Sequence, residues 1–190
     1  AFVDNGIGYF NNTASTTLGI GIDEGIIMSS GNIADAVGPN LTGSRSSQLN
    51  GNRSDPDLAT LTNANIRDAS VLEFDFIPSS DSVSFTFVFG SDEYPEYAGS
   101  NYNDPFGFFI SGPGISGTYS DSAINIAKLP GTNTEITINT VNAGVNSAYY
   151  IVNGTGNNGA GNAIDNPDVQ FDGFTIPIEV FAFVIPCDTY

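Results

Sequence analysis

Two apolar runs separated by an acidic loop constrain the fold of this chain more than any other feature. In the first run, residues 83–89, apolar side chains from Val83 onward occupy every second position and alternate with residues such as Ser84 and Thr86. This period of two is typical of a β-strand with one buried face. Gly90 ends the run, and a second apolar run occupies residues 106–110. The pattern predicts two core strands that hold the acidic loop between them.

The loop between these strands is crowded with oxygen ligands. Its candidate metal ligands are Glu93, Glu96, Asn103 and Asp104, followed by Asp92. Carboxylates this close in sequence repel one another unless a cation lies among them. The chain supplies few cations, because it has 21 acidic and four basic residues and a net charge of -17. Calcium suits such a loop, since it accepts roughly six to eight oxygen ligands in adaptable geometry. The alternative is an exposed acidic hairpin with Glu96 or Asp104 satisfied by backbone amides.

A second acidic cluster follows the glycine-rich stretch near the C-terminus. It contains Asp165, Asp168 and Asp172, which are the candidate ligands of a second calcium site. Taken alone, the cluster is better interpreted as turn chemistry, because Asp, Asn and Gly are ordinary turn formers. Neither cluster has the spacing of a helix–loop–helix calcium motif, so any site here is assembled from separate loops.

The remaining patterns predict an all-β protein. Short apolar runs separated by Gly/Pro turns, without alternating helices, favour an antiparallel β-sandwich or jelly roll with long Gly/Asn/Asp-rich loops. We expect a single domain over residues 1–190. The best helical candidate is a short turn at residues 57–62, capped by Asp55 or Asp57. The predicted strands are 25–30, 71–77, 83–89, 106–110, 135–139, 149–152 and 174–185, the last interrupted by Pro177. In the strand at 71–77, Leu72, Phe74 and Phe76 are expected to point inward.

Composition excludes several functions. The scarcity of Lys and Arg excludes nucleic acid and anionic membrane surfaces as partners. The chain has no His, and therefore no Ser-His-Asp apparatus and no ordinary zinc site. Glu93 and Glu96 as a glycosidase pair are a weaker interpretation than metal ligation, so we predict no enzyme. No apolar segment is long enough to cross a membrane. The single cysteine, Cys187, excludes a disulfide framework, and a buried or inert thiol is favoured over an intermolecular cross-link.

Several motifs resemble the bacterial Choice-of-anchor L domain, found in exported proteins that reach the cell surface through various anchors. The resemblance runs from about Gly6 to Tyr190, and its motifs are residues 72–76, 91–97, 103–114, 125–127, 138–142 and 172–174. The family commonly has Glu at the position of Asp92, a conservative change for an oxygen ligand. The family also usually extends past both ends of this chain, so we expect both ends to be truncated or completed by a neighbouring subunit. The resemblance implies an extracellular location at the bacterial cell surface.

Together these observations predict a non-enzymatic structural or adhesive module stabilised by calcium. Unpaired sheet edges can accept a strand from a neighbour, so other copies of the chain are possible partners and strand exchange could build a surface filament. Missing segments of the same polypeptide filling those edges are an equally good interpretation. The alternative function is a calcium-dependent carbohydrate-binding module that uses some of the eight Tyr residues to bind surface glycans, although the chain has no Trp.

Overall fold

The computed structural model describes residues 5–11, 20–48, 53–153 and 168–190. Within these ranges the chain forms short strands and 3-10 turns, with no α-helix. The strands are β1 (Ile7–Asn11), β2 (Glu24–Met28), β3 (Ser82–Phe87), β4 (Gly90–Ser91), β5 (Pro105–Phe106), β6 (Phe109–Ile110), β7 (Ile124–Asn125), β8 (Ile136–Thr137), β9 (Tyr150–Val152), β10 (Gly173–Thr175) and β11 (Ile178–Phe183). The 3-10 turns are η1 (Ile33–Ala36), η2 (Leu58–Thr60), η3 (Ser120–Ser122) and η4 (Ser147–Tyr149). The predicted all-β class is confirmed.

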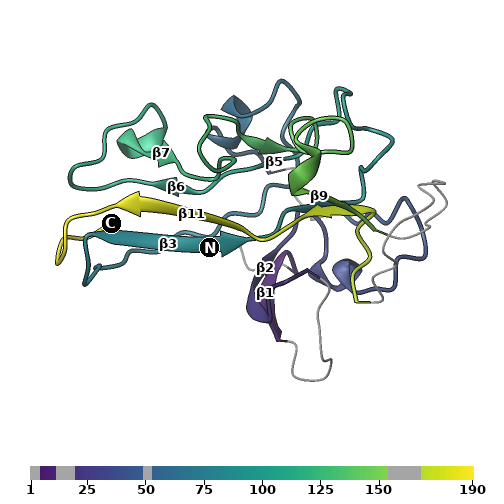
Figure 1. The fold of residues 1–190 in the computed structure, drawn as a ribbon, viewed down its shortest axis with the longest axis horizontal. Helices are drawn as coiled ribbons and strands as arrows, with labels where there is room; N and C mark the ends of the chain where they lie inside the picture. Colours follow the sequence, from purple (N-terminus) through teal and green to yellow (C-terminus); the bar gives the residue numbers. More distant parts are fainter. Residues whose placement is uncertain (1–4, 12–19, 49–52, 154–167) are drawn as a thin grey trace.

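All the strand pairs in the described ranges are antiparallel, and they form small sheets of two or three strands. Their orders are β1-β2, β4-β10-β9, β11-β3, β5-β8 and β6-β7. Figure 1 shows the β3–β11 ribbon parallel to the long axis at one end of the molecule, with β5, β6 and β7 on one side of it and the β1–β2 hairpin on the other. The sandwich arrangement stays a prediction.

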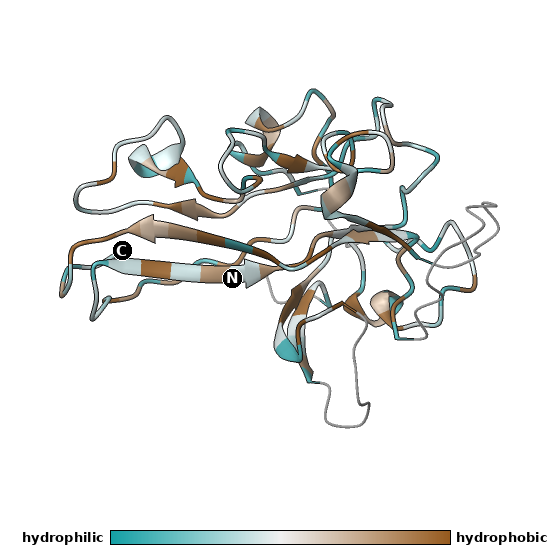
Figure 2. Cartoon of the chain, in the orientation of Figure 1, coloured by the Kyte–Doolittle hydropathy of each residue, from teal (hydrophilic) through white to brown (hydrophobic). Residues whose placement is uncertain are grey.

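The β3–β11 ribbon is the longest pairing between distant parts of the chain. Ile178 pairs with Phe87 and Phe183 pairs with Ser82. Burial alternates along both strands. The apolar face of β3, which the sequence predicts to be buried, is less exposed to solvent than its opposite face. Hydropathy alternates along β3 in the same way (Figure 2). The break at Pro177, between β10 and β11, is also confirmed.

The hydrophobic core lies on the inner face of this ribbon. Phe85 packs on Phe108 with ring centroids 4.3 Å apart, and Phe87 packs on Phe106 at 4.7 Å. The buried core residues are Ile110, Ile126, Leu129, Ile136, Val141, Ile178, Val180, Ala182, Val184 and Tyr190. The segments that flank the acidic loop, residues 82–87 and 105–110, are therefore held in one packed unit.

Two of the predicted strands differ in the structure because of their tertiary contacts. Residues 106–110 divide into β5, which pairs with β8, and β6, which pairs with β7, because the Phe108 N–H donates to the Asn125 side chain between them. Residues 71–77 do not form a strand: only Phe76 pairs with Tyr190, through two backbone hydrogen bonds. The expectation that Phe74 points inward is wrong, since this side chain is 54% exposed.

Three other details differ from the predictions. Strand β1 was not predicted from its sequence, which contains Gly8 between apolar residues. The expected turn is η2. Asp55 rather than Asp57 caps it, because Asp55 Oδ1 accepts from the Leu58 N–H. The Cys187 thiol is free and exposed, so the buried state is wrong, and an inert thiol stays a prediction. In the described ranges, no helix has the length and apolar character needed to cross a membrane.

Candidate functional site

The acidic loop begins where β4 pairs with β10. Ser91 lies opposite Gly173 and Gly90 lies opposite Phe174. This register brings Asp92, just after β4, next to Asp172, just before β10. A Cβ at Gly90 would lie 2.8 Å from the Phe171 ring, so the close approach of the two segments requires glycine at that position. Two acids 80 positions apart in the chain are thus neighbours in space.

Tyr94 fixes the start of the loop to the core. Its side chain is fully buried, and its hydroxyl donates to the Val141 carbonyl at 2.5 Å. Its ring packs on Tyr150 with centroids 4.8 Å apart. Burial raises the pKa of the Tyr94 hydroxyl, so it remains a hydrogen-bond donor. The acids on either side of Tyr94 are therefore held by an ordered anchor rather than by a free loop.

Ser91 connects two further acidic residues. Its hydroxyl donates to Asp104 Oδ2 at 3.3 Å and accepts from the Glu93 N–H at 3.0 Å. The two ends of the loop meet through this side chain, so Glu93 and Asp104 face a common region. Glu96, in the turn that follows, is exposed but still close enough to act on the Glu93 carboxyl.

The electrostatic environment of Asp92 is unfavourable for a free carboxylate. Burial and, secondly, the negative charge of Asp172 raise the pKa of Asp92 from 3.8 to about 7, although the Asp172 backbone donates a hydrogen bond to it. Its Oδ1 is buried and has no hydrogen-bond partner. A buried unpartnered carboxylate oxygen costs free energy unless a proton or a cation compensates it.

The other acids of the loop show the same trend. Burial and then the neighbouring Asp104 and Glu96 raise the pKa of the Glu93 carboxyl. Burial also raises the pKa of Asp104, and the hydrogen bond from Ser91 opposes this shift. Each of these groups would be stabilised in its ionised form by a nearby positive charge.

Buried amides that the sequence did not predict hold Asp172 in place. Asn40 Nδ2 donates to Asp172 Oδ1 at 2.7 Å and to the Asn153 carbonyl at 3.0 Å, and Asn40 Oδ1 accepts from Gln170 Nε2. The Asn153 side chain in turn donates to the backbone of Val169 and Phe171. Nothing in the local sequence separates these amides from the many exposed ones, because their partners lie up to 132 positions away.

The predicted site residues therefore fall into distinct groups. Asp92 and Asp172 meet, although the sequence placed them in different sites, and Glu93, Glu96 and Asp104 form an adjacent group. The Asn103 amide is engaged elsewhere: its Nδ2 donates to Thr62 and its Oδ1 accepts from the Asn139 N–H. Asp168 bonds to Gly38 through its backbone carbonyl. Asp165 lies outside the described residues.

Carboxylates alone do not complete a metal site in the part of the chain that the structure describes. No group of three acidic or sulfur side chains in the described ranges converges closely enough to hold an ion. An ion beside Asp92 would therefore need amide, hydroxyl or backbone oxygens in addition to carboxylates, which is ordinary for calcium. The unpartnered Oδ1 of Asp92 and the unpartnered hydroxyl of Tyr150 are consistent with an oxygen-rich site of this kind.

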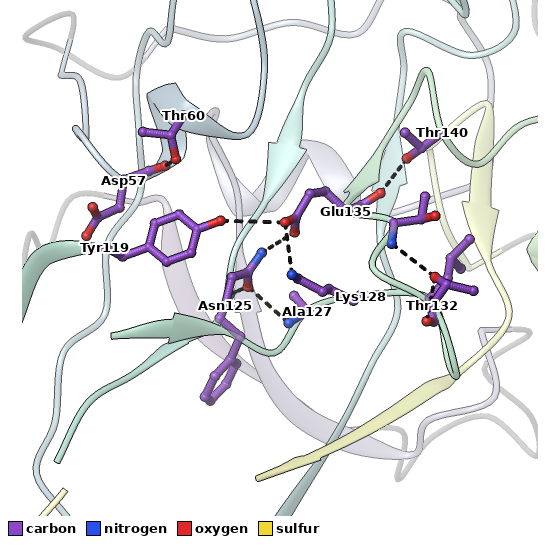
Figure 3. Close-up of polar contacts among 12 residues, drawn as sticks. Asp57, Thr60, Tyr119, Asn125, Ala127, Lys128, Thr132, Glu135 and Thr140 are labelled. Atoms are coloured by element: carbon purple, nitrogen blue, oxygen red, sulfur yellow. Dashed lines mark hydrogen bonds and ion pairs between the residues drawn. The ribbon is translucent and has the colours of Figure 1, made fainter. Parts of the chain in front are cut away.

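A second polar cluster surrounds Glu135, and its charges are satisfied (Figure 3). The Glu135 carboxylate accepts from Asn125 Nδ2 at 2.5 Å and from the Tyr119 hydroxyl, and it lies 3.4 Å from Lys128 Nζ. Asn125 Oδ1 accepts from the backbone of Phe108 and Ala127. This network ties β7 to the turn before β8, and its role is structural.

The family model described as Choice-of-anchor L domain matches residues 1–190, the full length. Neither the search of curated proteins nor the search of solved structures found a match. The family is a surface-anchoring module rather than a known enzyme family.

Proposed function

The chain belongs to the Choice-of-anchor L family of cell-surface modules, and we propose that it is a non-enzymatic extracellular structural or adhesive domain stabilised by calcium. The calcium site lies between the Asp92–Asp172 pair and the neighbouring group of Glu93 and Asp104. The observation that carries this proposal is the buried Oδ1 of Asp92, which has no partner and lies beside a second acid.

Three further features support calcium over an empty site. The pKa values of Asp92, Glu93 and Asp104 are all raised, so each ionised form is incompletely compensated without a further cation. The loop is already ordered by Tyr94, which lowers the entropic cost of binding. The net charge of -17 also attracts a divalent cation.

Calorimetric titration of calcium into the chelated protein tests the proposal. We expect a saturable binding event, and a melting temperature that falls by many degrees when excess chelator is added. Asp92→Asn should weaken calcium binding about tenfold or more, because it removes a charged ligand. The matched control is Asp23→Asn, which makes the same charge change at an exposed position.

An unchanged melting curve in chelator, with no calorimetric signal, would rule out the calcium site. Equal calcium binding by the two variants would show instead that calcium acts through the overall charge.

A second candidate function is assembly into a surface filament by strand exchange. Both long edges of the β3–β11 ribbon lack a paired strand among the described residues. Unpaired edges of this kind accept strands from other chains. On the outer face of β11, Phe181 and Phe183 are 62% and 75% exposed, which would favour burial in a neighbour.

Light scattering during size-exclusion chromatography tests this assembly. We expect the mean mass to rise with protein concentration in calcium, because calcium reduces the repulsion between acidic copies. A strictly monomeric protein at every concentration, with and without calcium, removes the filament proposal.

A further inference from the structure

A neutral polar depression lies at the far end of the acidic loop. Its volume is ≈ 100 Å³, and its lining includes four asparagines with a serine and a threonine: Asn63, Asn101, Asn103, Asn139, Ser100 and Thr62. None of the lining side chains is charged. In a chain with a net charge of -17, an uncharged pocket built mostly from amides differs from the surface around it.

Part of the lining is rigid. Asn103 bridges Thr62 and the Asn139 N–H, with distances of 3.0 and 3.1 Å. Asn139 Nδ2 donates to the Ser100 carbonyl at 2.9 Å, and its Oδ1 accepts from the Gly99 N–H. These bonds join three segments that are distant in sequence, so the pocket is formed before any ligand binds.

The remaining amides are available to a ligand. Asn63 and Asn101 are exposed, and within the described ranges their side chains have no hydrogen-bond partner. Each amide presents donors and an acceptor side by side. Adjacent hydroxyl groups on a ring both donate and accept, so they match two such amides.

An aromatic pair comes from the same loop. Tyr97 and Tyr102 pack edge to face with centroids 5.1 Å apart; Tyr102 lies between two lining residues in sequence but does not itself line the pocket, and it is 65% exposed. An exposed tyrosine ring offers an apolar surface with a polar tip. Such a ring suits the apolar face of a sugar.

We propose that this pocket binds a neutral saccharide: Asn63 and Asn101 bond adjacent hydroxyl groups of one sugar unit, and Tyr102, outside the lining, contacts the apolar face of the part that projects from the pocket. The pocket does not require calcium, because the amide of Asn103, the one lining residue among the candidate ligands, is already bonded to Thr62 and Asn139. Sulfated and carboxylated saccharides are disfavoured by the negative charge of the domain.

A glycan array followed by a titration monitored by NMR tests the proposal with the whole chain, once in calcium and once in chelator. We expect neutral glycans to bind and polyanionic ones not to bind. For the strongest neutral oligosaccharide, Asn63→Ala and Asn101→Ala should each weaken binding about three- to tenfold, the effect of one lost hydrogen bond. Tyr102→Ala should weaken it by a similar factor.

Asn65→Ala is the matched control, since Asn65 is exposed in the same segment but does not line the pocket. It should bind like the parent, and all the variants should keep the parent melting temperature. Saccharide binding in either buffer supports the pocket proposal, even if the calorimetric titration detects no calcium binding. The proposal is overturned if no neutral glycan binds in either buffer, or if the pocket variants bind as well as Asn65→Ala.

Discussion

Asp92 has an environment that disfavours a free carboxylate. Its Oδ1 is buried without a partner and Asp172 lies beside it. A proton or a cation must therefore compensate the charge, and the two respond differently to pH. A bound proton is lost as the pH rises, whereas calcium binds the ionised carboxylate more tightly.

The pH dependence of stability distinguishes the two. The folded pKa of Asp92 is raised to about 7 from 3.8, so between these values the folded state binds more protons than the unfolded chain. Stability without calcium should therefore fall as the pH rises from about 4 to about 7. Glu93 and Asp104 act in the same direction. Asp92→Asn should reduce this fall, as measured by urea unfolding in chelator.

Asp23→Asn is the control for that measurement, and it should leave the slope against pH unchanged. Saturating calcium should flatten or reverse the slope in the parent. A parent protein whose stability in chelator increases over this range would contradict the environment described for Asp92.

Two neighbouring tyrosines allow a matched test of buried hydroxyl groups. The Tyr94 hydroxyl donates to Val141, whereas the buried Tyr150 hydroxyl has no partner. Tyr94→Phe should lower the free energy of unfolding by about 1–3 kcal/mol, because it leaves the Val141 carbonyl without its donor. Tyr150→Phe should change it by less than about 0.5 kcal/mol. Urea unfolding in chelator measures both, and equal losses would contradict the Tyr94 anchor.

The β3–β11 ribbon positions the acidic loop because it has two different faces. Ile178 and Val180 point into the core, and Phe181 and Phe183 point outward. Alternation in β3 was enough to predict that strand from the sequence, since a period of two is a local property. Its pairing with β11, nearly 100 positions later, is not local, and the sequence pattern contains no signal for it.

Truncating side chains on the two faces of β11 should change the free energy of unfolding by different amounts. Ile178→Ala removes a side chain that is 1% exposed and should cost about 2–5 kcal/mol in the free energy of unfolding. Phe183→Ala should cost less than about 0.5 kcal/mol in dilute solution, because the larger side chain is already in solvent. Denaturant midpoints of the two variants check this, and a larger loss for Phe183→Ala would mean that its face is covered in solution.

Over the whole molecule, the acidic charge acts at long range as well as at the site. A net charge of -17 opposes the compact state through self-repulsion, and any salt reduces that repulsion. General screening and specific calcium binding must therefore be separated before calcium is assigned a structural role.

Salts at matched ionic strength separate these effects. Sodium chloride should raise the melting temperature of the chelated protein gradually, by reducing repulsion. Calcium chloride at the same ionic strength should raise it further and saturate, because a bound ion stabilises the folded state in proportion to its occupancy. Magnesium should be less effective, since it dehydrates reluctantly and demands octahedral geometry. Identical curves for all three salts would exclude a specific site.

The sequence by itself determined the all-β class, the buried face of β3 and the acidic loop, because alternation, turn residues and charge density are local properties of a chain. Only the tertiary structure showed that Asp172 lies beside Asp92 and that Asn40 bonds both Asp172 and the Asn153 carbonyl. It also showed that the Asn103 amide donates to Thr62. It also divided residues 106–110 between two partner strands. These contacts depend on which distant segments pack together. That packing is determined by the burial of the whole hydrophobic core, which is not a local property of the sequence.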